Sequence, residues 1–284
     1  MLVNFNNMLA QAKSGGFAIG SFNAYNYETI RGIIDAGSQA KSAGTIVAFG
    51  KKYLENMALE DAVAITSALA ARTDMPVCLH LDHCDDIDVI RMAIAAGFTS
   101  VMYDGSALPF EQNATNTRLV CELAYAAGVS VEAELGSLAA GEQSHEGSSA
   151  DREIYTDPDQ AARFIAETGV DALAVSVGTV HGLYKGKPNI RIDILRAINE
   201  KAGIPLVLHG GSGIPEETIT DCIHNGICKI NVNTEISVYA VEKTAQALCS
   251  GERPHLSVIG KKQQKYVSEV VAKYIAFFRH QSQA

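Results

Sequence analysis

The sequence predicts a single α/β domain folded as a (β/α)8 TIM barrel, with a helical extension at its C-terminus. Eight short runs rich in Val, Ile and Ala alternate with longer segments of helical spacing, as parallel strands joined by helices do. The 284 residues are 47% hydrophobic and show no break in composition, so one domain over residues 1–284 can bury the core. An open doubly wound sheet is the alternative, although no GxGxxG motif follows the first predicted strand.

The predicted strands are short apolar runs that stop at a polar residue or a glycine. They comprise residues 18–22, 45–49, 77–81, 100–103, 130–134, 172–177, 205–208 and 227–232. Between them, apolar residues recur at the spacing of one helix face. The predicted helices include residues 27–42, 59–72, 87–96, 110–127 and 159–168. Since the carboxyl ends of barrel strands meet at one rim, we expect the functional residues there.

Three histidines stand at or just past the ends of predicted strands, and together they indicate a zinc site. They are His83, His181 and His209. Strand ends far apart in the sequence meet only when a sheet curls them together, and three imidazoles with an open fourth position are typical of catalytic zinc. Each histidine taken alone could equally be a hydrogen-bonded packing residue. His80, inside its strand, is interpreted as such a packed imidazole.

Glycine-rich loops follow the sixth, seventh and eighth predicted strands, where barrels commonly bind a phosphate. The loops are residues 181–185, 209–213 and 231–234. Glycine lets backbone N–H groups approach an anion, and Lys185, Ser212 and Thr234 can add a charge and hydroxyl donors. Ordinary turns would explain the same glycines. The loops favour a phosphate site mainly because two of them begin with a proposed zinc ligand.

Charge and cysteine content exclude several classes of partner. The formal charge of −9 argues against nucleic acid, because phosphate neutralisation needs clustered Lys and Arg. The first residues lack a basic stretch followed by an apolar one, and no later run is long enough to span a bilayer, so we expect a cytoplasmic protein without a membrane partner. The six cysteines are interpreted as free thiols, since Cys78 and Cys228 lie in apolar strand-like runs.

Four segments closely resemble the class II, zinc-dependent ketose-bisphosphate aldolases. They are LHLDH at 79–83, VEAELG at 131–136, GTVHGLYK at 178–185 and PLVLHGGSG at 205–213. The resemblance also includes residues 102–106, 155–158 and 229–235, so it extends from Ser21 to Glu235. The chain is most similar to the tagatose and fructose bisphosphate aldolase branch. A lyase acting on a sugar phosphate, assembled as a homodimer or homotetramer, is what this resemblance implies.

The resemblance also implies a role for each matching residue. Zinc on His83, His181 and His209 would chelate oxygens of dihydroxyacetone phosphate and act as a Lewis acid for its enediolate. Asp82 would be the acid/base at the hydroxyl that becomes the aldehyde, and Glu142 would move the proton on the enediolate carbon. The remaining implied contacts are Asn231 on the enediolate oxygen; Asn23, Gly182, Lys185, Gly210, Gly211, Ser212, Asn233 and Thr234 on the substrate and its phosphate; Asp104 and Glu134 as secondary metal contacts; and a monovalent cation, Na⁺ or K⁺, near Val180 and Gly182.

Departures from the family pattern fall on the side of the site that would hold the aldehyde half of the substrate. Gly50 stands where the family usually has a serine, and Arg253 is displaced by one residue from the usual arginine position. Our hypothesis is that Lys51 or Lys52 binds an anionic far end by charge, although a solvated lysine pair explains them equally well. The far-end group and the C4 configuration of the substrate therefore stay open.

Two other functions are alternatives. A Schiff-base aldolase would need a strand lysine, and Lys229 is the candidate, because strand alternation places it on the same face as Asn231. Glu132 could neutralise that lysine instead. A non-catalytic barrel that binds a sugar phosphate is the second alternative. Asp82 and Glu142 beside three histidines argue against it, because a binding protein has no use for a positioned acid and base.

Overall fold

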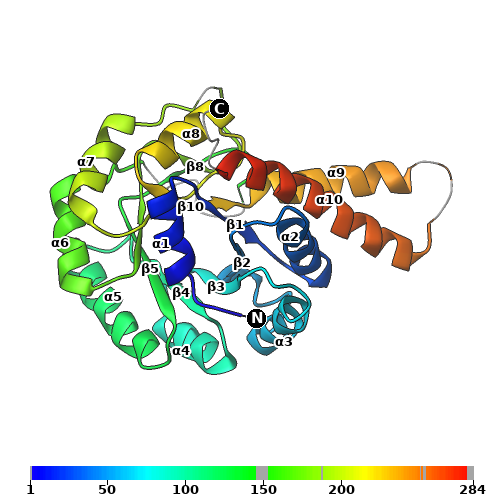
Figure 1. Ribbon diagram of the computed structural model, residues 1–284, viewed down its shortest axis with the longest axis horizontal. Helices are drawn as coiled ribbons and strands as arrows, with labels where there is room; N and C mark the ends of the chain where they lie inside the picture. The colour runs from blue at the N-terminus through cyan, green and yellow to red at the C-terminus, as the bar shows by residue number, and fades with distance from the viewer. Residues whose placement is uncertain (1, 145–152, 187, 250, 252–253, 280–284) are drawn as a thin grey trace.

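Eight parallel strands form a closed barrel, as the sequence predicts. The computed structural model describes residues 2–144, 153–186, 188–249, 251 and 254–279, and within them the strands follow one another around the barrel in the order β1-β10-β9-β7-β5-β4-β3-β2 (Figure 1). The barrel strands are β1 (Ile19–Asn23), β2 (Thr45–Gly50), β3 (Val77–Cys84), β4 (Ser100–Tyr103), β5 (Ser130–Leu135), β7 (Ala172–Val175), β9 (Leu206–Leu208) and β10 (Ile227–Val232). Two further strands, β6 (Ala139–Ala140) and β8 (Val180–His181), pair with each other at the rim.

Helices surround the barrel, and two long ones extend away from it (Figure 1). The helices are α1 (Asn6–Gly15), α2 (Tyr27–Gln39), the 3-10 turn η1 (Lys51–Tyr53), α3 (Leu59–Ala70), α4 (Ile87–Ala96), α5 (Phe110–Tyr125), α6 (Pro158–Thr168), α7 (Ile192–Ala202), α8 (Glu216–His224), α9 (Thr234–Leu248) and α10 (Leu256–Phe278). The predicted C-terminal helical extension corresponds to α9 and α10, which pack on each other, while α10 also packs on α2. None of the described helices is both long and apolar enough to cross a membrane.

Local sequence explains where several helices begin and end. Asn26 starts α2 with a capping box, in which its side chain accepts from the N–H of Thr29 and the Thr29 hydroxyl oxygen accepts from the Asn26 N–H. Asp157 caps α6, and Pro158 occupies its first turn, where the missing N–H costs nothing. Gly169 ends the same helix in the left-handed conformation, with φ 70°.

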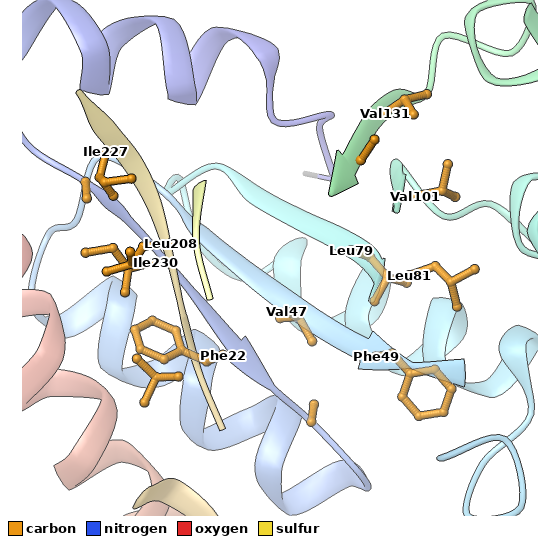
Figure 2. Close-up of a cluster of buried hydrophobic side chains, with 14 of the residues drawn as sticks. Phe22, Val47, Phe49, Leu79, Leu81, Val101, Val131, Leu208, Ile227 and Ile230 are labelled. Atoms are coloured by element: carbon orange, nitrogen blue, oxygen red, sulfur yellow. The ribbon is translucent and has the colours of Figure 1, made fainter. Parts of the chain in front are cut away.

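The two faces of each strand have different compositions. Side chains on the outer face, such as Val47, Leu79 and Leu81, form one buried apolar cluster with the helices (Figure 2). On the inner face, the lower barrel is apolar, and Leu9 of helix α1 and Phe5, the residue before this helix, contribute to its packing. Towards the carboxyl ends, the inner face becomes polar. Buried polar or charged residues there include Asn23, His80, Asp82, Glu132, Glu134, Lys229 and Asn231.

Two strand ends differ by two or more residues from the sequence-based expectation. β3 continues to Cys84 instead of stopping at residue 81, because it stays paired with β4 beyond a register shift. β7 ends at Val175, two residues early, because the chain leaves the barrel there to form the turn that leads into β8. All six cysteines are free thiols, five of them buried, as the sequence predicts.

Candidate active site with a three-histidine metal centre

Three imidazole rings converge at the carboxyl-terminal rim of the barrel. His83 is the second-last residue of β3, His181 lies in β8, and His209 directly follows β9. Ring centroids are 5.0 Å apart for His83 and His181, 4.6 Å for His83 and His209, and 6.1 Å for His181 and His209. One ring nitrogen of each lies within 4.8 Å of the other two. The structure therefore brings together the three residues predicted as metal ligands.

A bulge near the end of β3 directs two consecutive side chains, Asp82 and His83, to the same site. In a regular strand, neighbouring side chains point to opposite faces. Here the pairing of β3 with β4 shifts register between Leu81 and Cys84, and His83 adopts φ 44°. A left-handed backbone costs a non-glycine residue about 1–3 kcal/mol and is found mostly at functional sites. The bulge lets an acid and a potential ligand stand side by side.

Carboxylates hold two of the rings by one nitrogen each. Nδ1 of His83 lies 2.8 Å from Oδ2 of Asp104, and Nε2 of His209 lies 2.9 Å from Oε1 of Glu132. A carboxylate partner of this kind fixes the ring and its tautomer, and it directs the opposite nitrogen to a metal. The geometry is the one expected when Nε2 of His83 and Nδ1 of His209 are ligand atoms.

The third ring and a further carboxylate also fit a metal. Within the described residues, Nε2 of His181 is buried without a hydrogen-bond partner, which is costly unless a ligand uses it. Oε2 of Glu134 lies 3.2 Å from Nδ1 of His209. Asp104 and Glu134 also form a second potential metal-binding group with His83. The predicted secondary metal contacts thus lie beside the three imidazoles.

The histidines differ in their affinity for protons. Burial, together with the nearby imidazole of His83, holds the pKa of His181 well below its usual range, so this ring is neutral. Burial also opposes a charge on His209, but hydrogen bonds to Glu132 and Glu134 outweigh it and raise its pKa to about 9. Since a ligating imidazole must be neutral, His181 is ready to bind a metal, whereas His209 releases a proton on binding.

Asp82 is a buried carboxylate that accepts hydrogen bonds from two amides. Nδ2 of Asn23 donates to its Oδ2 at 3.0 Å, and Nδ2 of Asn231 donates to its Oδ1 at 3.1 Å. Burial favours the neutral acid, but the charges of His83 and Lys229 outweigh this effect and lower the Asp82 pKa to about 2. Asp82, Asn23 and Asn231, all predicted from the sequence as site residues, therefore lie together, and the Asp82 carboxylate is ionised.

Lys229 is fully buried and paired. Its Nζ lies 2.8 Å from Oε2 of Glu132 and donates to Oδ1 of Asn231 at 2.6 Å. The sequence left open whether Lys229 is a nucleophile or is neutralised by Glu132, and the geometry is that of the neutralised residue. An ammonium in an ion pair is a poor nucleophile because Schiff-base formation requires the free amine.

Glu142 lies on a loop that is hydrogen-bonded to the segment of a predicted metal ligand. The N–H of Gly141 donates to the carbonyl of His181 at 2.6 Å, and Glu142 exchanges two backbone bonds with Leu183, at 2.9 and 2.7 Å. The Glu142 side chain is 57% exposed, with Oε1 3.8 Å from Nζ of Lys185. A predicted proton carrier and a predicted phosphate ligand therefore face each other at the mouth of the site.

The predicted phosphate loops pack closely through their glycines. A Cβ on Gly210 would lie 2.2 Å from the carbonyl oxygen of Val180, and one on Gly182 would lie 2.5 Å from that of Glu142. Both glycines have positive φ, 69° and 112°. No other residue would permit this approach, so the loop after β9 packs against β8, and the loop after β8 packs against the Glu142 segment.

The remaining phosphate candidates lie around the start of α9. Thr234 is the first residue of this helix, and a helix N-terminus favours an anion. The hydroxyl of Ser212 accepts from the N–H of Glu235 at 3.2 Å. The N–H of Gly211 donates to the carbonyl of Asn231 at 2.9 Å, so this amide stabilises the loop instead of facing an anion.

Two tyrosines that the sequence did not single out contact Asn233. The Tyr25 hydroxyl donates to Oδ1 of Asn233, whose Nδ2 donates to the hydroxyl of Tyr53 at 3.3 Å. The two rings pack edge to face, with centroids 4.7 Å apart. A side chain on Gly50 would meet the Tyr53 ring at 3.2 Å, so the tyrosine occupies the space beside the missing serine. Tyrosines that follow strands resemble core residues, and no sequence signal distinguished these.

Lys51 has an acidic neighbour. Its Nζ lies 2.6 Å from Oδ1 of Asp85 and 3.8 Å from Oδ2 of Asp86. Lys52, next in the chain, is exposed. Arg253, the other residue considered for the far end of a substrate, lies outside the described residues.

A closed (β/α)8 barrel whose rim holds three converging imidazoles and a buried carboxylate defines a class of protein, the barrel enzymes built around a metal-binding site. A comparison with family models narrows this class. The chain belongs to the class-II fructose-bisphosphate aldolase family, whose model matches residues 3–283. Its members are aldolases, and aldolases are lyases. The resemblance found in the sequence is confirmed.

Individual relatives agree with this family. The chain is 40% identical over 241 residues to the sulfofructosephosphate aldolase of Alkalicoccus urumqiensis, which covers 85% of this chain and 83% of the relative. It is 39% identical over 241 residues to the D-tagatose-1,6-bisphosphate aldolase subunit GatY of Klebsiella oxytoca, covering 84% and 83%. Among solved structures, the YdjI aldolase of Escherichia coli K12 matches with a TM-score of 0.87 at 32% identity, over 100% of both chains. The two relatives are aldolases named for different substrates, and the chain is almost equally identical to both.

Proposed function

We propose that this chain is a zinc-dependent aldolase that reversibly cleaves a ketose 1-phosphate into dihydroxyacetone phosphate and an aldehyde. The observation that carries the proposal is the convergence of three imidazole nitrogens within 4.8 Å beside the buried carboxylate of Asp82. His83, His181 and His209 would hold the ion, with Asp104 and Glu134 as secondary contacts. Bound zinc would supply Lewis acidity that stabilises the negative charge of the enediolate.

The protein groups around this centre suit the proton transfers of an aldol cleavage. Asp82, ionised and fixed by two amides, would accept the proton of the hydroxyl that becomes the aldehyde, and would return it in the condensation direction. Glu142 would protonate the enediolate carbon, since its exposed side chain stands on a loop beside the His181 segment. Asn231, whose amide nitrogen faces Asp82, would bind the enediolate oxygen.

The substrate would be anchored by its C1 phosphate and distinguished by its far end. Gly182, Lys185, Gly210 and Ser212, with Asn233 and Thr234 at the start of α9, would bind the phosphate, and the loop around Gly211 would support them. Na⁺ or K⁺ would bind near Val180 and Gly182. We propose an anionic far end, either the phosphate of tagatose or fructose 1,6-bisphosphate or a sulfonate. The positions of Lys51 and Lys52 directly after β2 support this choice.

The decisive experiment is a cleavage panel of ketose 1-phosphates that differ in the far-end group and in C4 configuration. We expect release of dihydroxyacetone phosphate that a chelator abolishes and added zinc restores, with the best substrate identifying the far end. Borohydride in the presence of substrate should leave the protein active, because no Schiff base forms. If no member is cleaved with zinc restored, while a sugar phosphate still binds, the aldolase assignment is wrong.

We also propose that the chain forms a homodimer or homotetramer in the cytoplasm. Large apolar side chains are exposed on the extended α9 and α10, among them Val241 and Leu256, and a partner chain would cover them. The free thiols fit a reducing compartment. Light scattering of the purified protein tests the assembly, and a monomer at micromolar concentration would contradict it.

A further inference from the structure

Two of the most deeply buried charges in the barrel have no step in the proposed chemistry. Lys229 and Glu132 are both 0% exposed and lie 2.8 Å apart. Removing two charges from water costs so much that a buried ion pair often contributes little net stability. Stability alone therefore explains this pair poorly, and its contacts suggest another role.

The pair connects the candidate metal centre to the candidate acid/base. Nε2 of His209 lies 2.9 Å from Oε1 of Glu132, whose Oε2 contacts Nζ of Lys229. Nζ of Lys229 then donates to Oδ1 of Asn231 at 2.6 Å, and Nδ2 of Asn231 donates to Asp82 at 3.1 Å. The connection is continuous and buried, and it joins side chains from β3, β5 and β10 with the residue after β9.

The donors and acceptors around Asn231 permit only one orientation of its side-chain amide. The two ends of an asparagine amide have nearly the same shape, so packing alone does not orient it. An ammonium only donates and an ionised carboxylate only accepts. Lys229 therefore requires Oδ1 on its side, and Asp82 requires Nδ2 on the other. The second hydrogen of Nδ2 then remains to bind a substrate oxygen.

The same logic applies at His209. Glu132 accepts a hydrogen bond from Nε2, which places the proton of the neutral ring there and leaves Nδ1 as the ligand atom. Lys229 contacts the other oxygen of Glu132, Oε2, and leaves Oε1 to accept from His209. His80, whose Nε2 lies 3.8 Å from Oε2 of Glu132 and from Oδ1 of Asp82, is also close to the pair.

We propose that Lys229 and Glu132 are positioning residues with separate tasks, Lys229 orienting the Asn231 amide and Glu132 orienting His209 for the metal. The proposal rests on the proposed function, because it assigns the pair to that same site. Both residues are fully buried, and the proposed function assigns neither of them a contact with the substrate. The two tasks differ in their consequences, and this difference makes them separable by experiment.

The first test compares zinc affinity, measured without substrate by competition with a fluorescent chelator. Glu132→Gln keeps the shape of the side chain but no longer fixes the His209 tautomer, so we expect its zinc dissociation constant to rise about 10–100-fold. Lys229→Met should remain within about threefold of the native value, because Oε1 of Glu132 still holds Nε2 of His209 and Asn231 binds no metal. A folded Glu132→Gln protein with native zinc affinity would overturn the role of Glu132.

The second test measures turnover and analogue binding at saturating zinc. We expect Lys229→Met to lose about 10²-fold in kcat, and to bind a hydroxamate analogue of the enediolate correspondingly less tightly, because the Asn231 amide loses one of the two contacts that orient it. Lys229→Gln, which keeps an N–H donor, should recover part of both. Native kcat and analogue binding in Lys229→Met would overturn the role of Lys229. Lys265→Met, on the exposed side of α10, is the matched control and should behave as native.

The double variant Glu132→Gln/Lys229→Met separates positioning from charge balance. Each single change leaves one buried charge without its partner and should lower the melting temperature, whereas the double variant removes both charges and should recover much of it. Its kcat should stay low, and recovery of kcat together with the melting temperature would show a purely structural pair. If Lys229→Met alone does not fold, the double variant is compared with Glu132→Gln at saturating zinc, and an equal kcat in the two would overturn the role of Lys229. Zinc and analogue binding are measured without turnover, so they test the pair even if the native chain cleaves no ketose in the panel.

Discussion

At the scale of single residues, burial and neighbouring charge determine which groups of this site carry a proton. His80, which is not one of the predicted metal ligands, is an example. Its ring is 0% exposed, and Nδ1 lies 2.8 Å from the hydroxyl of Ser100. Burial, followed by the charge of Lys229, lowers the His80 pKa to about 4. The ring is neutral in the folded protein at any pH where the enzyme would work.

This pKa predicts a contribution of His80 to acid sensitivity. The unfolded chain binds a proton at the usual His pKa of about 6.5, whereas the folded chain binds it only near pH 4, so stability rises with pH between these values. The His80 contribution, roughly 3 kcal/mol, is complete above pH 6.5 and is lost as the pH falls through 4. In urea unfolding of the metal-free protein, His80→Gln should show a smaller change in unfolding free energy over this range. The same pH dependence in the native and variant proteins would contradict the prediction.

The lysines after β2 provide a second residue-scale prediction. Changing Lys51 and Lys52 to Ala should raise KM for the ketose about fivefold, because the anionic far end of the substrate loses its counter-charge. The change also leaves the Asp85 carboxylate, now 2.6 Å from Nζ of Lys51, without this partner, and its negative charge would repel the same far end. Enediolate formation should be unaffected. The exchange of the dihydroxyacetone phosphate proton with solvent measures this step. Lys265→Ala on α10 serves as a control for the loss of a surface charge. An unchanged KM in the double variant would reject the hypothesis.

Some residues of the candidate site could be predicted from the sequence, and others could not. His83, His181 and His209 were recognisable because each stands where a strand ends, and their convergence follows from closing the barrel. Tyr25 and Tyr53 were not, because the direction of a tyrosine hydroxyl depends on rotamers and on a partner from a distant element, here Asn233. The sequence therefore identified candidate ligands better than the groups that orient them.

At the scale of secondary structure, the short β6–β8 pair links two functions of the rim. Ala139 and Ala140 pair with Val180 and His181, so the loop that carries Glu142 is hydrogen-bonded to the segment that carries a predicted metal ligand. The eight barrel strands were predictable because strands that are buried on both faces read as near-continuous apolar runs. A two-residue strand has no such signal, since only its partner across the rim defines it. The extension of β3 past its bulge escaped prediction for the same reason.

Disturbing the β6–β8 pair should uncouple Glu142 from the metal site. A side chain at Gly141 would place its Cβ 2.6 Å from the carbonyl oxygen of Leu183, so Gly141→Val must displace this loop. We expect the rate of proton exchange of dihydroxyacetone phosphate to fall about 10²-fold, because Glu142 moves away from the carbon of the enediolate that it would protonate. In Gly260→Ala, the new Cβ would meet only the flexible end of Glu28, at 3.1 Å, and exchange should be native. Native exchange in a folded Gly141→Val protein would contradict the role of this pair.

At the scale of the whole molecule, the barrel combines an apolar exterior layer with a polar interior rim. Alternation along β3 places Leu79 and Leu81 in the helix-facing core and His80 and Asp82 on the inner face. Sequence periodicity predicts this division, but the pairing of inner charges depends on strand order and register. Glu132 meets Lys229 across the barrel interior, although β5 and β10 are not neighbours.

Zinc should therefore stabilise the barrel as a whole, because its three proposed ligands come from segments that only the folded chain brings together. At a free zinc concentration 100 times the dissociation constant, binding to the native state adds about 2.7 kcal/mol to the free energy of unfolding. For a chain of this size, that corresponds to a rise in melting temperature of about 5 °C. Calorimetry of the chelator-treated protein, with and without zinc, measures it. His181→Ala removes one ligand and should lose most of the rise, whereas an equal rise in that variant would show that zinc binds elsewhere and that the three imidazoles are not its site.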